Sequence, residues 1–227
     1  MAEKSALMMI RLGAPPEREE EWNDWLNNVH IPSRLDNMPG ILAVRRFTAL
    51  EGEPKYLNLW ELANADAPTS EGYGKLREKE DLMPPDSFEV ITRGIPQFSR
   101  EVYEQIYPEQ GEYQMPDTQF VLVVGHDVPA DREEEYNAWY HTEHIPAIMQ
   151  VPGFVTARRF VAVKSVPAKA SSGSPAPKYL SVYDLESKET LQSEAFSKAR
   201  NTPWSDRVRN CIIPRLRIIG QLIYRKP

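Results

Sequence analysis

The sequence predicts an α+β fold made of two copies of one βαββαβ unit, joined head to tail. The 227-residue chain has room for two domains of about 100 residues. Residues 6–32 align without gaps on residues 120–146. Both copies also place their aliphatic, acidic and turn residues in the same order. A repeat of this length indicates a duplicated structural unit.

The aligned segments share ten positions, and the repeat then continues after a one-residue deletion. The first ten pairs are Pro15, Arg18, Glu19, Glu20, Glu21, Asn23, Trp25, His30, Ile31 and Pro32 with Pro129, Arg132, Glu133, Glu134, Glu135, Asn137, Trp139, His144, Ile145 and Pro146. The later matches are Pro39-Gly40 with Pro152-Gly153, Arg45-Arg46-Phe47 with Arg158-Arg159-Phe160, and residues 55–62 with residues 178–185.

Each copy opens with an aliphatic stretch that predicts a strand, over residues 6–12 and 120–126. A turn with proline follows, and then three glutamates, whose charge complements the dipole of a helix N-terminus. We expect this helix to end near His30 and His144, because the residue before a proline disfavours helical backbone.

The rest of each copy predicts two strands, a helix and a final strand. The two strands pass through the Arg-Arg-Phe and Lys-Tyr-Leu segments. The second helix is expected over residues 70–80 and 190–201, and the last strand over residues 88–93 and 216–224. The order βαββαβ is that of a ferredoxin-like unit.

Two such units bury their sheets against each other more readily than one is stable alone, so we expect a barrel-like pair. The predicted N-terminal repeat covers residues 1–106 and the C-terminal repeat residues 118–227, with a linker at residues 107–117. Residues 164–178 are rich in Ser, Pro and Ala and predict a mobile hairpin loop.

Tandem units with a Trp…His-Ile-Pro…Pro-Gly core resemble the dimeric α+β barrel superfamily, in particular its EthD-like branch. The resemblance covers nearly the whole chain in two copies. It implies a ferredoxin-like barrel and a small-molecule ligand. The superfamily includes cofactor-free monooxygenases, polyketide cyclases, isomerases, lyases and haem enzymes, so the fold alone does not identify a reaction.

Composition argues against several classes of partner. The net charge of −6 disfavours a broad nucleic-acid or anionic-membrane surface. A single cysteine, Cys211, excludes an internal disulfide and suits a reducing compartment. The N-terminal apolar stretch is too short for a signal peptide or a membrane span. We therefore expect a cytoplasmic protein, and two chains could pair further into a homodimer.

The two copies differ where a site would lie. On the first helix, helical spacing places Trp22, Trp25, Leu26, Val29 and His30 on one stripe, which predicts a buried face. The C-terminal equivalents are Tyr136, Trp139, Tyr140, Glu143 and His144. A carboxylate on a buried stripe needs a partner or a raised pKa.

The C-terminal copy also has His126 in place of Leu12 and His141 in place of Asn27. We therefore predict one active pocket, between helix and sheet of the C-terminal copy, with the N-terminal copy mainly a scaffold. The candidate catalytic residues are Glu143, His144, His126 and Tyr140, and the candidate substrate-binding residues are Trp139, His141, Arg158 and Tyr179.

Each candidate also has a structural interpretation. A histidine in the last turn of a helix can simply complement the helix dipole, which is favoured for His30 and equally open for His144. Trp139 can be a core aromatic, and Tyr179 is only a weak indication of a pocket. Because neighbours on a strand face opposite ways, one of Arg158 and Arg159 points inward, and a structural ion pair is favoured for that arginine.

Metal binding is disfavoured, because the segment from His141 to His144 matches no metalloprotease motif. Haem needs a single axial histidine, so the sequence leaves it open. We expect cofactor-free general acid–base catalysis of a lyase, isomerase or cyclase step on an apolar, aromatic or polyketide-like compound. The alternatives are a haem-, metal- or oxygen-dependent oxidoreductase and a non-catalytic binding protein. Under the main hypothesis, Glu143→Gln cripples turnover and Val29→Ala does not.

Overall fold

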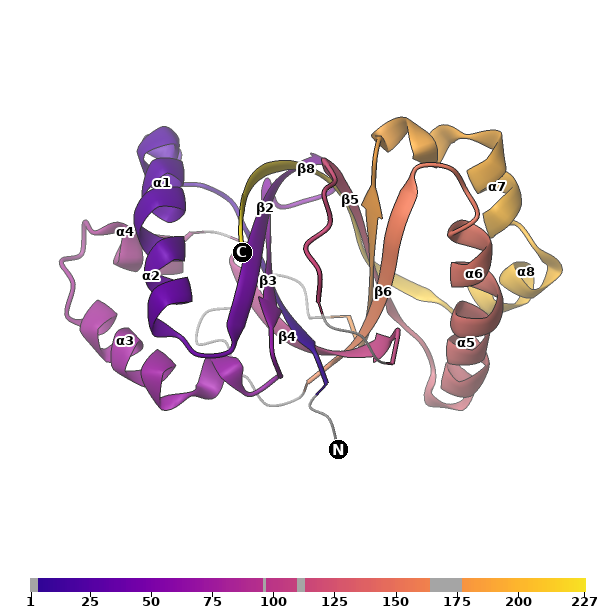
Figure 1. Cartoon of the computed structure of the whole chain (residues 1–227), viewed down its shortest axis with the longest axis horizontal. Coiled ribbons are helices and arrows are strands. Elements are labelled where there is room, and N and C mark those ends of the chain that lie inside the picture. The colour runs from indigo at the N-terminus through magenta and orange to yellow at the C-terminus, as the bar shows by residue number, and fades with distance from the viewer. Residues whose placement is uncertain (1–3, 96, 110–112, 164–176) are drawn as a thin grey trace.

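The computed structural model describes residues 4–95, 97–109, 113–163 and 177–227, and within them eight strands close into one barrel. Helices cover the outside at two opposite ends (Figure 1). The strands, in their order around the barrel, are β1 (Ala6–Leu12), β3 (Tyr56–Leu62), β2 (Ile41–Glu51), β8 (Ile213–Lys226), β5 (Phe120–Asp127), β7 (Tyr179–Leu185), β6 (Phe154–Ala162) and β4 (Ser99–Tyr107). Every pairing is antiparallel. Most of the hairpin loop expected at residues 164–178 lies outside the described residues.

The helices divide between the two ends of the molecule (Figure 1). The N-terminal half has α1 (Glu19–Trp25), the π-helical η1 (Leu26–His30), α2 (Ile31–Asn37), the short η2 (Ala67–Thr69), α3 (Glu71–Asp81) and α4 (Phe88–Arg93). The C-terminal half has η3 (Ala130–Arg132), α5 (Glu133–Trp139), the π-helical η4 (Tyr140–His144), α6 (Ile145–Ile148), η5 (Lys188–Gln192), α7 (Glu194–Arg200) and α8 (Pro203–Arg209). The predicted α+β class and the barrel-like arrangement are therefore confirmed.

The halves are joined at two seams. At one seam β8 pairs with β5 of its own half and with β2 of the other half. At the second seam β4 pairs with β1 and with β6. The last strand of each half thus completes the sheet of both halves. The side chains inside the barrel, among them Leu7, Phe47, Val121, Phe160 and Val182, form one buried apolar cluster.

Two buried ion pairs cross between the halves inside the barrel. Arg45 of the N-terminal half contacts Asp184 of the C-terminal half. Reciprocally, Arg158 donates two hydrogen bonds of 2.7 Å to Glu61. Arg45 and Arg158 are repeat equivalents, and so are Glu61 and Asp184. Each half therefore neutralises the arginine of the other.

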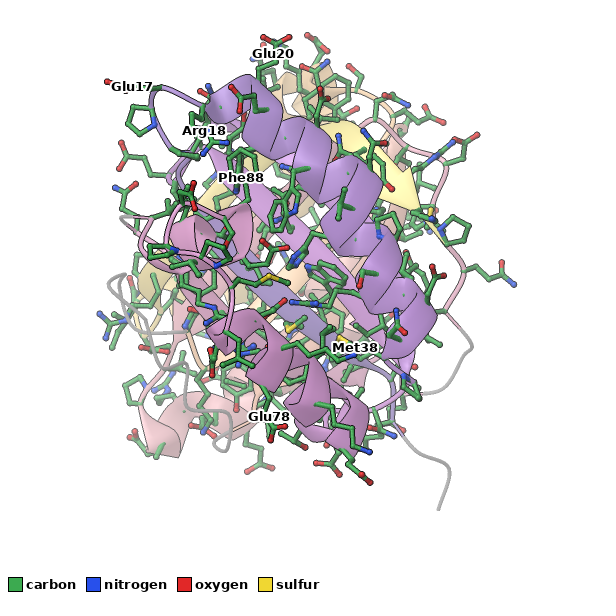
Figure 2. All side chains as sticks on the ribbon, turned by 90° about the vertical axis from the view of Figure 1, so that its left-hand side faces the viewer. Glu17, Arg18, Glu20, Met38, Glu78 and Phe88 are labelled. Carbon is green, nitrogen blue, oxygen red and sulfur yellow. The ribbon has the colours of Figure 1, made fainter. Side chains whose placement is uncertain are left out.

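The expected terminal strand at residues 88–93 is wrong, because this segment is helix α4 and the strand lies later, at β4. Helix α4 has only 6 residues, between the caps Ser87 and Gly94. An apolar run this short is compatible with a helix and with a strand. Figure 2 looks onto this end of the molecule, where Phe88 of α4 lies beside Arg18. The Arg18 guanidinium is 4.2 Å from the centre of the Phe88 ring.

Candidate functional site

The first helix of each half continues past the predicted stop at His30 and His144, so that expectation is wrong. The chain passes through a π-helical turn and resumes as α2 or α6. The N–H group of Ile31 donates to the carbonyl of Leu26, five residues earlier, and Ile145 does the same to Tyr140. Ile31 keeps helical backbone angles although Pro32 follows it. The extra residue of a π turn thus accommodates the proline, and such turns are frequent at functional sites.

The π turn also rotates the helix face away from the predicted stripe. The buried positions of the N-terminal helix are Trp22, Leu26, Ile31 and Arg34, with a five-residue step across the turn. Val29, which the regular period placed on the buried face, is 53% exposed. Its equivalent Glu143 is half-buried and accepts a hydrogen bond from the Thr202 hydroxyl at 2.5 Å, so its carboxylate has an ordinary structural partner.

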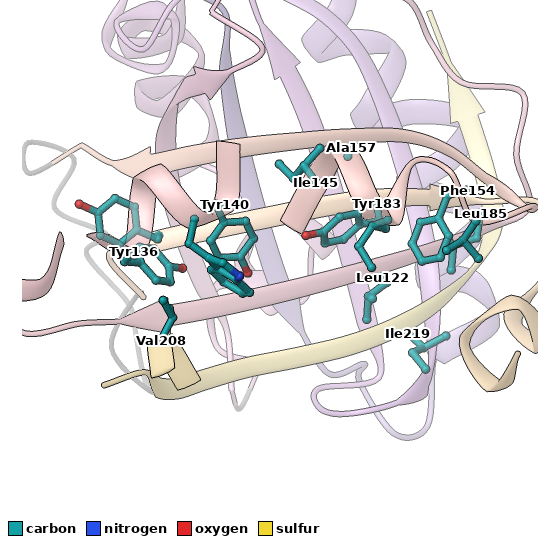
Figure 3. Close-up of a cluster of buried hydrophobic side chains, with 14 of the residues drawn as sticks. Leu122, Tyr136, Tyr140, Ile145, Phe154, Ala157, Tyr183, Leu185, Val208 and Ile219 are labelled. Carbon is teal, nitrogen blue, oxygen red and sulfur yellow. The ribbon is translucent and has the colours of Figure 1, made fainter. Parts of the chain in front are cut away.

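A cavity of about 380 Å³ lies between the helices and the sheet of the C-terminal half, and we call it the C-terminal pocket. Three of the four candidate catalytic residues line it, namely His126, Tyr140 and His144, and so does Trp139. Glu143 is not among the lining residues. The apolar wall is formed by Leu122, Val124, Ile148, Phe154, Phe196 and Ile212. Figure 3 shows Tyr140, Tyr183 and Phe154 in this helix–sheet layer.

His144 is the last residue of η4, and its ring packs against two aromatic rings. Its ring centre lies 4.4 Å from that of Trp139 and 5.0 Å from that of Tyr140. Burial, followed by the positive charges of Arg209 and Arg200, lowers the pKa of His144 to about 3. Its Nδ1 atom is buried without a hydrogen-bond partner among the described residues. His144 is therefore a neutral imidazole with unused bonding capacity.

His126, at the end of β5, reaches the same pocket. Its Nδ1 atom lies 3.2 Å from the Tyr136 hydroxyl, and its ring centre is 6.4 Å from that of Tyr140. Burial, followed by the charge of Arg159, lowers the pKa of His126 to about 4. The pocket thus contains two imidazoles that are both neutral at pH 7.

Three arginines stand at the same pocket, Arg200, Arg209 and Arg217. Burial lowers the pKa of Arg200, and the charges of Arg209 and Arg217 contribute to the same lowering. Arg209 has an exposed ion pair with Asp206, and Arg217 has one with Glu51. Arg200 has no carboxylate within 4.0 Å in the part of the chain that the structure describes. This group of cations favours an anionic ligand.

The equivalent N-terminal cavity is much smaller, at about 80 Å³. Buried Arg34 forms an ion pair with buried Glu80, and Arg93 donates to the same carboxylate at 3.0 Å. These residues line the cavity beside His30, whose pKa burial lowers well below its ordinary value. This pocket is therefore open in the C-terminal copy and filled by salt-bridged side chains in the N-terminal copy.

The remaining predicted site residues lie elsewhere. Trp139 donates its indole N–H to Ser205 at 3.2 Å. Arg158 faces the barrel interior and is paired with Glu61, the structural ion pair that the repeated arginines favoured. His141 and Tyr179 line a separate cleft near the seam of β4 and β6. The sequence reasoning did not identify the arginines of α7, α8 and β8, although their clustering near the C-terminus was a visible signal.

No protein-family profile and no curated protein matches the chain. Its similarity is to solved structures. A candidate monooxygenase from Fusobacterium nucleatum matches with a TM-score of 0.63 and 8% identity, over 100% of this chain and 95% of that one. A variant chlorite dismutase from Candidatus Nitrospira defluvii in complex with cyanide matches with a TM-score of 0.60 and 7% identity, over 99% and 92%. A haem-binding protein from Thermus thermophilus matches with a TM-score of 0.55 and 13% identity, over 99% and 92%.

The chain has the dimeric α+β barrel fold. At these identities the likeness establishes the fold alone. Two further observations concern the residues that the structure describes. They contain no helix that is both long and apolar enough to span a membrane. They also contain no group of three or more His, Cys, Asp or Glu side chains placed to hold a metal ion.

Proposed function

We propose that the chain is a haem-binding oxidoreductase, in which the C-terminal pocket would hold the cofactor and His144 would bind its iron. The difference between the two copies carries the proposal. The C-terminal pocket encloses about 380 Å³ and contains a neutral histidine whose Nδ1 has no partner among the described residues. The equivalent N-terminal cavity, about 80 Å³, contains ion-paired side chains instead.

The residues of the C-terminal pocket fit a haem. Iron binds the neutral imidazole, and the low pKa keeps His144 in that form. The apolar wall suits the macrocycle. Arg200, together with Arg209 and Arg217, suits the two propionate carboxylates.

A bound haem supplies one-electron and oxygen chemistry that amino-acid side chains lack. The chain's own residues then have separate tasks. His126 is a neutral base in the same pocket, and in the tautomer whose Nδ1–H donates to the Tyr136 oxygen, Nε2 would accept a substrate proton. Phe154 and Ile148 help to exclude water. The arginines hold anionic groups in place.

The similarity to a haem-binding protein, to a chlorite dismutase and to a candidate monooxygenase supports an oxidoreductase. It gives no support to the expected cofactor-free lyase, isomerase or cyclase. Several expectations remain proposals: membership of the EthD-like branch, the linker at residues 107–117, the scaffold role of the N-terminal repeat, a small-molecule substrate, a cytoplasmic location and further pairing into a homodimer.

The proposal is tested by titrating hemin into the purified chain and following the Soret absorption band. We expect saturation at one hemin per chain. His144→Ala should weaken binding at least tenfold and alter the band, because the axial ligand is lost. The matched control is His30→Ala, which removes the equivalent histidine and should bind like the unmodified chain. Absence of saturable binding, or equal binding by His144→Ala, contradicts the proposal.

A further inference from the structure

Arg159, on β6, is a fully buried cation without a carboxylate partner. Its exposed fraction is 0%, and no acidic side chain of the described residues lies within ion-pair distance of it. One nitrogen, Nη1, donates to Nε2 of His141 at 2.7 Å. The other two, Nε and Nη2, have no acceptor among the described residues. Buried polar groups are ordinarily satisfied, so this free edge requires an explanation.

Aromatic rings surround the guanidinium but do not satisfy it. Its central carbon lies 4.0 Å from the ring centre of Tyr140, 5.0 Å from that of Tyr136 and 5.6 Å from that of Tyr179. The Tyr136 hydroxyl is near enough for the arginine to affect its pKa, yet it does not meet hydrogen-bond geometry with Nε or Nη2. Cation–π contacts stabilise the charge and leave the N–H donors unused.

The N-terminal copy shows the same arginine fully satisfied. Arg46 donates to three asparagine side chains: Nη1 to Asn27 at 2.5 Å, Nη2 to Asn23 at 2.7 Å and Nε to Asn58 at 3.3 Å. In the C-terminal copy the equivalents of Asn27, Asn23 and Asn58 are His141, Asn137 and Ser181. Ser181 is the cross-strand neighbour of Arg159, as Asn58 is of Arg46. The acceptor for Nε has therefore been replaced by a shorter side chain.

We propose that the Nε–Nη2 edge of Arg159 is a binding site for the carboxylate of a small molecule, separate from the C-terminal pocket. These two N–H groups lie on the same side of the guanidinium and match the two oxygens of a carboxylate in a bidentate contact. The Ser181 side chain is shorter than that of Asn58 and supplies no acceptor to Nε of Arg159. The rings of Tyr140 and Tyr179 suit an aromatic body attached to the carboxylate.

The route to this site is the cleft lined by His141, Asn137 and Tyr179, which has a volume of about 610 Å³. Because the guanidinium itself is buried, a ligand reaches it only when the half-buried Asn137 and His141 side chains move aside. Among the described residues the Oδ1 atom of Asn137 has no donor, and its Nδ2 donates one hydrogen bond, to the Tyr179 hydroxyl at 3.3 Å. Lys4 and Glu109 line the outer cleft with opposite charges.

Isothermal titration with benzoate, an aromatic carboxylate, tests the site. We expect saturable binding of one benzoate per chain, and at least a tenfold loss in Arg159→Gln. The double variant His141→Asn with Ser181→Asn restores the amide set of the first copy, and it should also lose binding at least tenfold because the edge is then occupied. Circular dichroism and the thermal midpoint show that each variant is folded.

Two controls make the result specific. Ser181→Ala adds no acceptor, so benzoate should bind as it does to the unmodified chain. His144→Ala removes the proposed haem ligand and should also leave benzoate binding unchanged, which separates failure of one site from failure of the other. The site is refuted if the unmodified chain shows no saturable binding, or if folded Arg159→Gln or the folded double variant binds benzoate normally. Inorganic phosphate should bind more weakly, and tighter binding of phosphate than of benzoate rejects the carboxylate assignment.

Discussion

The neutral state of His144 predicts that acid destabilises this fold more than it destabilises a variant without that histidine. Burial lowers the folded-state pKa of His144 to about 3, while the unfolded chain has the ordinary value of 6.5. Above pH 6.5 both states are neutral at this residue, and its protonation does not affect stability. As the pH falls below 6.5 the unfolded chain binds a proton that the folded chain does not bind, so the folded state becomes less stable until about pH 3.

The size of the effect follows from the pH interval. At pH 5 the medium is about 1.5 pH units below the unfolded pKa, and each unit corresponds to about 1.4 kcal/mol, so His144 alone costs about 2 kcal/mol. His144→Gln removes this proton-binding difference. His126 and His30, whose pKa values are also lowered, act equally in both proteins and cancel in the comparison.

The assay is urea unfolding at pH 7 and at pH 5, for the unmodified chain and for His144→Gln. The unmodified chain should lose about 2 kcal/mol more unfolding free energy between the two pH values than the variant does. If the two proteins lose the same free energy, within about 0.5 kcal/mol, then His144 is not held neutral by its surroundings. The basis for its role as an iron ligand would then fail too.

Two further predictions concern the ion pair across the barrel and the glutamate next to the pocket. Asp184→Asn removes the contacting carboxylate of buried Arg45 and leaves it only Glu61, at 3.8 Å, which Arg158 already binds. We expect the unfolding free energy to fall by about 3 kcal/mol. The double variant Arg45→Met with Asp184→Leu should recover most of this loss in urea unfolding, and an equal loss in the double variant would contradict the cause. Glu143→Gln should lower the free energy of unfolding by about 1 kcal/mol or less, because the amide oxygen still accepts from the Thr202 hydroxyl. Hemin affinity should be unchanged in both Glu143→Gln and Val29→Ala. A tenfold loss of hemin affinity in Glu143→Gln alone would show that the carboxylate belongs to the site.

The fold could be predicted because, after duplication, each secondary-structure element can be predicted from two equivalent segments of the sequence. The paired Pro-Gly turns at residues 39–40 and 152–153 illustrate this, since each has glycine at positive φ, 91° and 93°. The helix ends could not be predicted, because a proline after His30 signals a stop only in regular α-helix. The π turn inserts one residue, and no local propensity in the sequence distinguishes it from a helix end.

The candidate site was predicted in part for the same reason. His126, Tyr140 and His144 do line one cavity, and they were found because they replace apolar residues of the first copy or neighbour such a replacement. Glu143 was selected by regular helical periodicity, which fails within the π turn that contains it. The unpaired edge of Arg159 was not predicted, because it is recognised only by comparison with Arg46, whose three asparagine acceptors lie on α1, η1 and β3 and come together only in the folded chain.

The crossed ion pairs inside the barrel bear on how the two halves could diverge. An arginine of one half reaching an acid of the other is the arrangement that two identical, separate units would also make across a twofold axis. Once both units belong to one chain, a substitution in one need not appear in the other. The shared interior can then stay symmetrical while the outer helices change independently. This freedom allows Arg34 and Glu80 to close one pocket while its counterpart stays open.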